Sequence, residues 1–422
     1  MIDAAGDPKL PMVTTADAHT ADTDYINVAV EARFGVKTTV LRSLSHSPPI
    51  DGSVERVHEL EAHASPTSVR WCDAPDLAKL DDPEDRRAVA LWMQAGGNTQ
   101  EWMQPGWFDL ASDWTRRALT DAGLGVAVEI RQLRNWASSC VLRARTPQGE
   151  FYFKALPDSA RVEWAVTMWL ANVYPDVTPR IVASERDHRW LLMAACAGRM
   201  LEEVHDVADW ETGATRYARL QADCVARVDE LVELGCPPRD VDGLSRSMAT
   251  LLHDTAALRC GETDGLTRAE CDRLRQSLPL LQRRCDELAT YRIAATIEHG
   301  DLWPGNIFVA GPTAVVIDWE DVAVGHPFFS LAPLQVGLAN AGLDSAENSA
   351  RLERAYLAGF SRFGPAEHLH RALSLAAPLS FIEMALRYSR QPSAIVALHP
   401  WMRDLVPQAL RLALARLDDA VR

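Results

Sequence analysis

The sequence has no C-x-x-C pair, no apolar run long enough to cross a membrane, and no Cys/His cluster with the spacing of metal ligands. The longest apolar run, around 376–386, is interrupted by Pro378 and Glu383, which argues against a membrane span. The eight cysteines are scattered, which is typical of a reducing cytoplasm where thiols act as small buried apolar groups. A zinc site is therefore not expected.

Basic residues are too few to balance the acidic ones, because 43 Lys and Arg stand against 58 Asp and Glu, a formal net charge of −15. This excess disfavours nucleic acid and an anionic membrane as partners. It is compatible with a cationic substrate, but we favour the simpler explanation of a soluble acidic surface. Residues 1–24 have no basic segment leading into an apolar one, so we expect a disordered lead-in to a cytoplasmic protein and no secretory signal.

The chain is long enough for two or three domains, since 422 residues exceed one ordinary core. We expect a small α+β domain at 25–95, whose role the sequence does not indicate, followed by a linker. A second segment, 106–200, has an amphipathic helix and antiparallel strands, and a third, 201–422, is mostly helical. The expected helices span 25–34, 73–80, 83–93, 108–120, 159–173, 209–234, 241–258, 268–288, 346–363, 366–387 and 401–419, and the expected strands span 38–44, 54–62, 126–133, 139–145, 150–156, 179–184, 190–194, 306–309 and 314–317.

The chemistry is concentrated at 297–331, around the short hairpin expected in the third segment. Asp301 lies on the loop before the hairpin, Asn306 enters the hairpin and Asp318 leaves it. A tight hairpin brings its two ends together, so the Asn306 amide and the Asp318 carboxylate can converge on one cation. Phosphoryl transfer needs such oxygen ligands for magnesium and a carboxylate that orients the attacking hydroxyl. Either acid alone could be a turn former or a helix cap, but the two acids and Asn306 at these intervals favour a catalytic site.

The stretch H-G-D-L-W-P-G-N at 299–306, followed by V-V-I-D-W at 315–319, resembles the aminoglycoside phosphotransferase and choline kinase superfamily. The resemblance implies an α+β, two-lobed protein-kinase-like fold. Residues 106–200 would form a nucleotide-binding N-lobe with a small antiparallel sheet, and 201–422 a mostly helical C-lobe with the catalytic loop and the acceptor pocket. The small domain at 25–95 precedes both lobes and is not covered by the resemblance.

The same resemblance implies roles for individual residues. Asp301 is expected to be the catalytic base, Asn306 and Asp318 the magnesium ligands, and His299 the residue that braces the catalytic loop. Trp303 is expected to be a packing residue beside the loop, and so is Trp319.

This sequence departs from the family pattern at two positions. His326 and Ser330 stand where the family usually has Asp, and the second of those acids normally braces the catalytic loop by hydrogen bonding. We therefore expect Ser330 to brace the loop more weakly. Glu320 and Asp321 follow the metal-binding Asp directly, and their role stays open between a contact to metal or cationic substrate and plain solvated charge.

A kinase also needs a cation on the ATP phosphates, held by a carboxylate on a helix. Lys154, in the apolar strand F-Y-F-K-A, resembles that cation, and Glu163 on the next helix is its expected partner. Leu192, Met193 and Ala194 resemble the hinge whose backbone groups bind adenine. A solvent-facing edge residue is the alternative for Lys154.

The loop that covers the phosphates in protein kinases has glycines, but the equivalent turn here, R-Q-L-R-N-W-A-S-S-C-V, has none. Ser138 and Ser139 are candidates to donate hydroxyl or backbone N–H groups to phosphate oxygens. Ordinary turn serines are the alternative for both positions.

The sequence thus predicts an ATP-dependent phosphotransferase that uses Mg²⁺ and modifies a hydroxyl of a small polar or cationic molecule, with GTP as a second candidate donor. The candidate acceptors are an aminoglycoside-like antibiotic, a sugar and an amino alcohol. A different hypothesis is a catalytically weak nucleotide-binding module that regulates a protein partner, which the missing glycines and Ser330 would favour. The intact set of Asp301, Asn306 and Asp318 argues for the enzyme.

Overall fold

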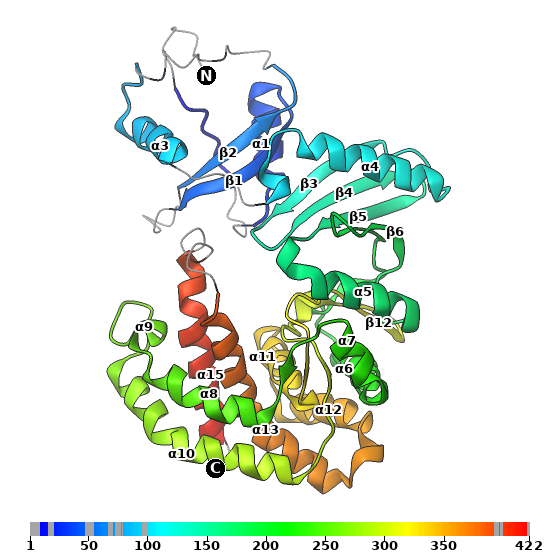
Figure 1. Ribbon diagram of the computed structural model, residues 1–422, viewed down its shortest axis with the longest axis vertical. Coiled ribbons are helices and arrows are strands. Elements are labelled where there is room, and N and C mark those ends of the chain that lie inside the picture. The colour runs from blue at the N-terminus through cyan, green and yellow to red at the C-terminus, as the bar shows by residue number, and fades with distance from the viewer. Residues whose placement is uncertain are drawn as a thin grey trace. The chain divides into compact units, whose positions relative to one another are not determined.

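The computed structural model of the chain describes residues 9–15, 21–46, 55–65, 71, 77, 79–94, 100–391, 396 and 400–419. The chain forms two compact units, each with its own core (Figure 1). The first, called the sheet unit here, comprises Met1–Ser159, Ile181–Ala195 and Ser393–Pro400. The second, the helical unit, comprises Ala160–Arg180, Cys196–Pro392 and Trp401–Arg422.

The sheet unit is built on five antiparallel strands in the order β3-β4-β5-β7-β6, with helix α4 along one face (Figure 1). Alternate side chains such as Leu142, Phe153 and Leu192 are buried, and Trp107 of α4 packs with them. The opposite face therefore holds Lys154 of the central strand. The bounds are α4 Trp107–Asp121, β3 Glu129–Asn135, β4 Cys140–Thr146, β5 Gly149–Ala155, β6 Ile181–Glu185 and β7 Trp190–Ala194.

A smaller α+β module precedes the five-stranded sheet within the same unit. It consists of α1 (Asp24–Phe34), the antiparallel pair β1 (Thr38–His46) and β2 (Arg56–Ala62), and α3 (Pro83–Gln94). Ile26, Val30 and Phe34 recur at the spacing of one helix face and pack against Val40 of β1. Gly35 ends α1 in the left-handed conformation that glycine adopts without strain. The helix expected at 73–80 lies largely outside the described residues.

Side-chain amides of β3 hold this module against the sheet. The Gln132 amide accepts from Val40 N at 2.8 Å and donates to Val40 O at 2.9 Å, so it bonds the strand as a backbone peptide would. Asn135 Nδ2 donates to Val40 O and to Leu41 O. The segment 21–23, at the end of the expected lead-in, also bonds to β3, with Thr23 N donating to Leu133 O at 2.8 Å.

The helical unit surrounds two small three-stranded sheets that position the catalytic segment. One sheet has the order β12-β11-β8 and the other β10-β13-β9. The strands are β8 Arg199–Met200, β9 Pro238–Arg239, β10 Thr296–Glu298, β11 Ile307–Ala310, β12 Thr313–Val316 and β13 Ala323–Gly325. The helices are α5 Arg161–Val173, α6 Val207–Cys224, α7 Val228–Glu233, α8 Val241–His253, α9 Thr255–Leu258, α10 Arg268–Thr290, α11 Leu331–Asn340, α12 Ala346–Ala358, α13 Ala366–Tyr388 and α15 Leu405–Asp419.

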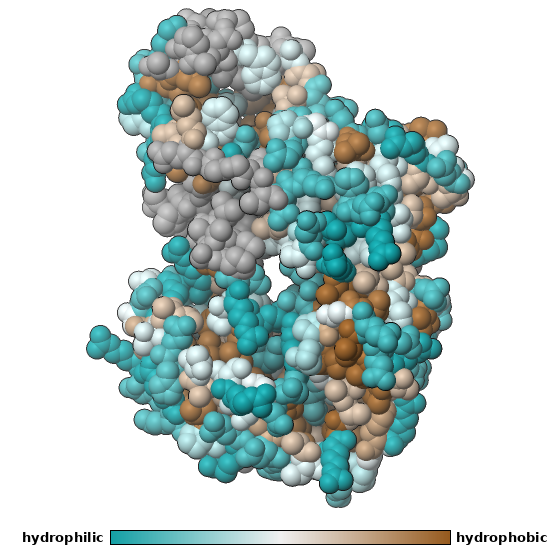
Figure 2. Space-filling view, viewed as in Figure 1, coloured by the Kyte–Doolittle hydropathy of each residue, from teal (hydrophilic) through white to brown (hydrophobic). Residues whose placement is uncertain are grey.

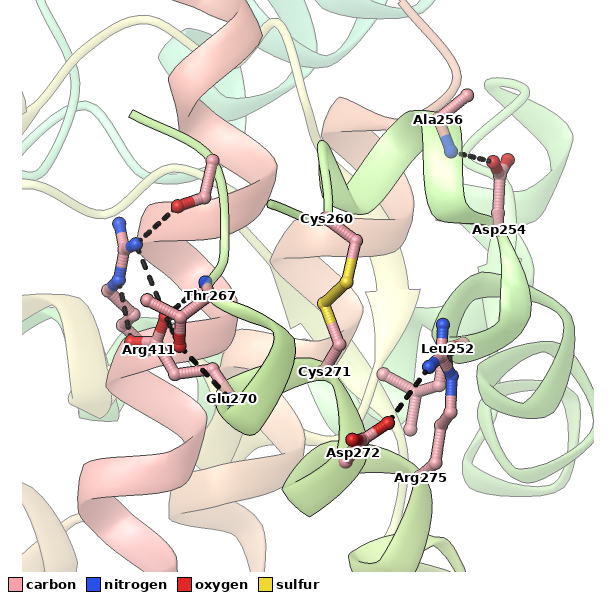
Figure 3. The surroundings of a disulfide bond; sticks show 11 residues. Leu252, Asp254, Ala256, Cys260, Thr267, Glu270, Cys271, Asp272, Arg275 and Arg411 are labelled. Atoms are coloured by element: carbon pink, nitrogen blue, oxygen red, sulfur yellow. Dashed lines mark hydrogen bonds and ion pairs between the residues drawn. A yellow bond between two sulfur atoms is a disulfide. The ribbon is translucent and has the colours of Figure 1, made fainter. Parts of the chain in front are cut away.

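A disulfide joins Cys260 and Cys271 in the helical unit, next to the start of α10 (Figure 3). The expectation of unpaired thiols throughout is therefore wrong at this pair, because the fold brings together two cysteines that no short motif connects. At the same helix start, Thr267 and Glu270 form a reciprocal capping box, and Arg411 of α15 bonds to Glu270 at 2.9 Å. Burial raises the pKa of the Cys140 thiol in the sheet unit to about 12.

Two further findings concern the described part of the chain. None of its helices combines the length and apolarity needed to cross a membrane. None of its His, Cys, Asp and Glu side chains gather in groups of three or more that could hold a metal ion. On the face shown in Figure 2, hydrophilic residues predominate among those that are coloured, and apolar residues form smaller patches.

Candidate active site

The catalytic loop follows β10 and turns back on itself before the hairpin. Trp303 N donates to Asp301 O at 2.8 Å, and Asn306 N donates to Trp303 O at 2.9 Å. The Asn306 side chain then closes the loop, because its Nδ2 donates to Asp301 O at 2.9 Å and lies 3.5 Å from Asp301 Oδ2. The structure therefore brings Asp301 and Asn306 together.

The hairpin of β11 and β12 brings the third predicted residue to the same place. Ile307 pairs with Val316, and Ile317 N donates to Asn306 O at 3.0 Å, so the strand pairing ends where Asp318 begins. Asp318 has a φ of 66°, a left-handed conformation that Asp tolerates better than most residues and that turns the chain out of the strand. The Asp318 carboxylate is close enough to act on the pKa of Asp301.

His299 braces the loop in a single protonation state. Its Nδ1 accepts from Asp301 N at 3.2 Å, so the proton lies on Nε2, which donates to Ile317 O at 2.9 Å. Burial lowers the pKa of His299 to about 4, so the ring is neutral at physiological pH. The ring also packs against buried Trp319, with 4.6 Å between ring centroids. His299 thus ties Ile317, the residue before Asp318, to the backbone of Asp301.

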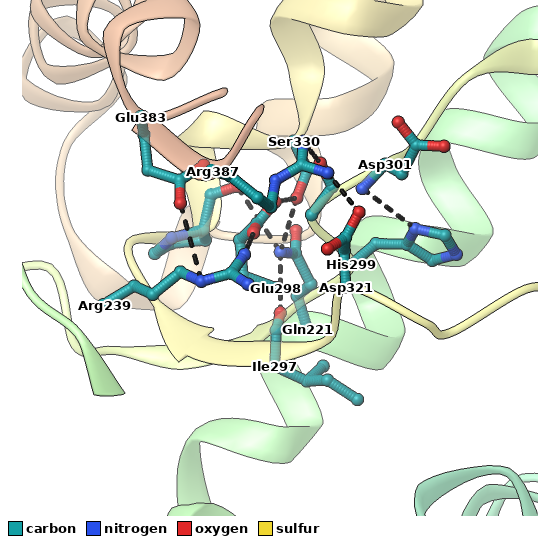
Figure 4. Close-up of polar contacts among 12 residues, drawn as sticks. Gln221, Arg239, Ile297, Glu298, His299, Asp301, Asp321, Ser330, Glu383 and Arg387 are labelled. Carbon is teal, nitrogen blue, oxygen red and sulfur yellow. Dashed lines mark hydrogen bonds and ion pairs between the residues drawn. The ribbon is translucent and has the colours of Figure 1, made fainter. Parts of the chain in front are cut away.

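Gly300 and Arg387 fix the other side of the loop. Gly300 has a φ of 81°, and a Cβ added there would lie 2.4 Å from Asp321 O. The buried guanidinium of Arg387, on α13, donates to Gly300 O and forms an ion pair with the Asp321 carboxylate (Figure 4). The Asp321 carboxylate is thus paired with Arg387, which is neither the contact to metal or substrate nor the solvated charge considered for it. The neighbouring Glu320 is exposed.

The electrostatics of the loop suit a carboxylate that exchanges a proton. Burial raises the pKa of Asp301 to about 6, and the Asp321 and Asp318 carboxylates add to this shift. The Arg387 charge and the hydrogen bond from Asn306 oppose it. A base whose pKa lies near the working pH is efficient in both accepting and returning a proton.

Lys154 lies on the face of the sheet opposite the buried core, between Val141 of β4 and Leu191 of β7. Tyr152, two residues earlier on the same strand, shares this face by the alternation of the strand. Lys154 belongs to the sheet unit, whereas Glu163, buried on α5, belongs to the helical unit. Their ion pair stays a prediction.

The predicted hinge forms β7. Leu192 is fully buried and is in register with strands on both sides, opposite Phe153 and Ala183. In the described pairing Ala194 is in register with Phe151 of β5 alone. Its outward backbone groups are therefore the best placed of the three to meet a base, while Leu192 contributes to the core.

The turn that holds Ser138 and Ser139 is closed without glycine. Trp136 N donates to Ser139 O at 2.8 Å, and Trp102 Nε1 donates to Trp136 O at 2.9 Å. The side chain of Asn135, at the start of the turn, bonds to β1 as described above. The turn is thus fixed from the N-terminal module as well as from its own backbone.

A model of the phosphotransferase enzyme family matches residues 129–372, more than half of the chain. The chain belongs to this family. Among solved structures, the choline kinase from Cryptosporidium parvum Iowa II has a TM-score of 0.50 at 12% identity and covers 75% of this chain and 94% of its own. An aminoglycoside-3'-phosphotransferase of type VIII is 22% identical, covers 61% of this chain and 99% of its own, and has a TM-score of 0.39. No curated protein sequence matches the chain.

These comparisons confirm two predictions: the superfamily resemblance and the α+β, two-lobed protein-kinase-like fold. The family match begins at residue 129. The N-terminal module therefore lies outside it.

In this phosphotransferase, Ser330 still belongs to a buried brace behind the catalytic loop. His299 N donates to Tyr217 Oη at 3.0 Å, Tyr217 Oη lies 3.0 Å from Ser330 Oγ, and Ser330 Oγ donates to Glu298 Oε1 at 2.9 Å. Burial raises the pKa of Glu298, and the Glu383 carboxylate adds to the shift, whereas Arg239 opposes it.

His326, the second departure from the family pattern, also accepts a hydrogen bond as a carboxylate would. Its Nδ1 accepts from Phe328 N at 3.2 Å and so caps the short 3₁₀ turn that leads to Ser330. Burial lowers the pKa of His326 to about 3, which keeps the ring neutral.

Sequence reasoning missed several residues around the candidate site, because all of them except Glu298 lie far along the chain from the motif that they support. The one local signal was an acid, Glu298, at the end of the short apolar strand before the motif. The residues missed are Tyr217, Gln221, Arg239, Glu298, Tyr356, Glu383 and Arg387.

The donors at the hairpin fit a magnesium ion. Because Asn306 Nδ2 is used in the bond to Asp301 O, the amide oxygen is the atom left to coordinate a cation. Mg²⁺ takes oxygen ligands, and it is usually bound by one or two protein groups together with phosphate and water. An amide oxygen and the Asp318 carboxylate at the end of one hairpin meet that requirement.

Proposed function

We propose that this phosphotransferase moves the γ-phosphate of ATP to a hydroxyl group of a small polar or cationic molecule. The observation that supports it best is the meeting of the Asp301 carboxylate and the Asn306 amide at the mouth of the hairpin that leads to Asp318. Without a shared role, these three groups would not be expected to gather beside a loop that His299 and Arg387 brace.

In the proposed reaction Asp301 orients the acceptor hydroxyl and takes its proton. The acceptor oxygen forms a bond to the γ-phosphorus as the bond from that phosphorus to the bridging oxygen breaks, and ADP leaves with the electron pair. Mg²⁺, held by Asn306 and Asp318, would neutralise charge on the phosphate oxygens when bound. His299 and Arg387 keep the Asp301 backbone in place, because His299 accepts from the N–H and Arg387 donates to the C=O of the peptide that joins Gly300 and Asp301.

The nucleotide is proposed to bind the face of the sheet that holds Lys154, opposite the buried core. Lys154 is the expected cation for the phosphates, with Glu163 as its partner, and Ser138 and Ser139 are expected to donate to phosphate oxygens. Ala194 is expected to meet the adenine edge with its backbone. GTP is the second candidate donor.

The acceptor is proposed to be an aminoglycoside-like antibiotic, a sugar or an amino alcohol. The net charge of −15 suits a cationic acceptor. Because Asp321 is neutralised by Arg387, it is not available to attract one, and the exposed Glu320 is the better candidate.

The test is a screen of such hydroxyl acceptors with ATP and GTP in the presence of Mg²⁺, followed by release of the nucleoside diphosphate. We expect turnover by the native protein and a loss of at least about 100-fold in Asp301→Ala and Asp318→Ala. Asp344→Ala, an exposed acid in the same unit, is the matched control and should retain full turnover.

Two outcomes would contradict the proposal. Equal turnover in folded Asp301→Ala protein would remove the assigned base. Magnesium-dependent ATP binding by calorimetry, with no phosphate transferred to any acceptor, would favour the regulatory module instead.

A further inference from the structure

We infer that Glu298 is a positioning residue for the catalytic loop, and that the pair Glu298 and Ser330 replaces a single acid at position 330. The inference rests on the proposed function, because it assigns what holds the proposed base in place. It concerns a buried hydrogen-bonded chain that starts at the backbone of the loop.

The chain has one possible direction. The Glu298 carboxylate can only accept, so Ser330 Oγ donates its single proton to Glu298 Oε1 at 2.9 Å. Ser330 Oγ therefore accepts the Tyr217 hydroxyl proton at 3.0 Å, and Tyr217 Oη accepts from His299 N at 3.0 Å, since a backbone N–H can only donate. The carboxylate is the terminal acceptor, and it sets the direction of the two hydroxyl bonds.

The members of this chain are closed off from solvent, which makes each bond costly to lose. Tyr217 and His299 are fully buried, Ser330 is 1% exposed and Glu298 is 4% exposed. A buried donor without an acceptor loses its bonds to water and gains nothing in return. Without Glu298 the Ser330 proton would have to find another acceptor, and the Tyr217 hydroxyl could be released from His299 N.

Arg239 lies between this carboxylate and a second one, Glu383 of α13. Arg239 Nη1 lies 3.9 Å from Glu298 Oε2, and Arg239 Nε lies 3.5 Å from Glu383 Oε1 (Figure 4). Gln221 Nε2 donates to Ile297 O at 2.9 Å and lies 3.3 Å from Ser330 Oγ, which fixes the strand that carries Glu298.

The distance between the two positions explains why only one of them is acidic. Ser330 Oγ is already in hydrogen-bond contact with Glu298, so a carboxylate at position 330 would place two negative charges side by side in a buried site. An acid at position 330 could instead accept directly from Tyr217. Either position can therefore supply the terminal acceptor, but the two together should repel each other.

The test exchanges the acid between the two positions. We expect Glu298→Leu to lower kcat roughly 10- to 100-fold, the usual effect of removing a buried group that orients an active-site residue. Ser330→Asp alone should also lower kcat, through repulsion from Glu298. The double variant Glu298→Leu/Ser330→Asp should recover most of the loss, because the carboxylate introduced at position 330 then accepts from Tyr217.

Two further variants separate positioning from general damage. Tyr217→Phe removes the link without changing charge and should lower kcat with little change in the KM for ATP. Glu347→Leu, an exposed acid on α12, is the matched acid-to-apolar control and should leave kcat unchanged.

Amide hydrogen exchange at His299 provides a readout that needs no turnover. Exchange should be faster in Glu298→Leu and Tyr217→Phe, and slow again in the double variant. An unchanged exchange rate and kcat in Glu298→Leu, or a double variant no better than the worse single one, would overturn the inference. If the native protein transfers no phosphate, the proposed function fails, and the exchange rates still decide whether the brace exists.

Discussion

At the scale of single residues, the catalytic loop depends on one position where any side chain would collide with the backbone. Gly300 combines a φ of 81° with a contact of 2.4 Å between its virtual Cβ and Asp321 O. Gly311, in the hairpin turn, has a similar φ of 57° but open space around it. Comparing these two glycines separates the free-energy cost of the left-handed backbone from the cost of the close contact with Asp321.

We predict that Gly311→Ala costs about 1–2 kcal/mol of unfolding free energy, the ordinary penalty for a left-handed conformation. Gly300→Ala should cost more and should also abolish most turnover, because Asp321 and Arg387 must move to make room. Urea unfolding and steady-state kinetics of the two variants provide the comparison. Equal effects of both substitutions would show that the contact with Asp321 is not restrictive.

A second residue-scale prediction concerns pH. Asp301 must be ionised to accept a proton, and burial raises its pKa to about 6, so turnover should fall on the acid side about tenfold per pH unit below that value. Asp321→Asn removes a charge that raises this pKa and releases Arg387, whose charge lowers it. Both changes act in the same direction, so the acid limb of kcat/KM should move to lower pH.

The matched control for this prediction is Glu347→Gln, an exposed acid that should leave the acid limb where it is. A limb that moves to higher pH in Asp321→Asn would contradict the assignment of Asp301 as the titrating base.

At the scale of elements, the N-terminal module is attached to the sheet by side-chain amides that bond to the backbone of β1, as a neighbouring strand would. Gln132 is 3% exposed and bonds to both backbone groups of Val40. Without Gln132 the buried N–H of Val40 would lose the side-chain oxygen that accepts its hydrogen bond. Asn135, three residues later, bonds to the same edge and also begins the turn with Ser138 and Ser139.

We predict that Gln132→Leu lowers the unfolding free energy by about 1–3 kcal/mol, the cost of a buried donor left without an acceptor. The group left without its hydrogen bond is mainly Val40 N, because Val40 O keeps the bond from Asn135. Denaturant unfolding followed by tryptophan fluorescence gives the measurement. Gln148→Leu, at an exposed turn of the same unit, should cost a few tenths of a kcal/mol at most.

At the scale of the whole molecule, the two units have separate hydrophobic cores, so a single two-state transition is not expected. The disulfide between Cys260 and Cys271 lies in the helical unit alone. By loop-closure entropy, a bridge between residues 11 apart contributes about 2–3 kcal/mol.

We therefore predict that a reductant, or the double variant Cys260→Ala/Cys271→Ala, lowers the unfolding midpoint of the helical unit and leaves that of the sheet unit unchanged. Far-UV circular dichroism, which helices dominate, follows the helical unit, and amide hydrogen exchange in the five-stranded sheet follows the sheet unit. Identical stability of the double variant and the oxidised native protein would show that the bond does not form.

Local signals in the sequence predict the elements with strong periodicity and the residues of one short motif. Helix 25–34 and the strands around 150–156 were predicted within a few residues, because their apolar spacing and turn residues are local signals. Asp301, Asn306 and Asp318 were recognised for the same reason, since only a short hairpin separates the last two. The short strand β13 and helix α11, which have weak local signals, were not predicted.

The contacts that hold that motif in place form between segments that are distant in the sequence, so local signals do not predict them. Tyr217 and Arg387 reach the catalytic loop from α6 and α13, and no spacing in the sequence connects them with it. Glu298 directly precedes the motif, but it meets its partner Ser330 only through the fold. The same holds for the disulfide and for the Gln132 bonds to Val40, which span 92 positions. Local physics selects helices, strands and turns, whereas the partners of a buried polar group depend on which distant segments fold against it.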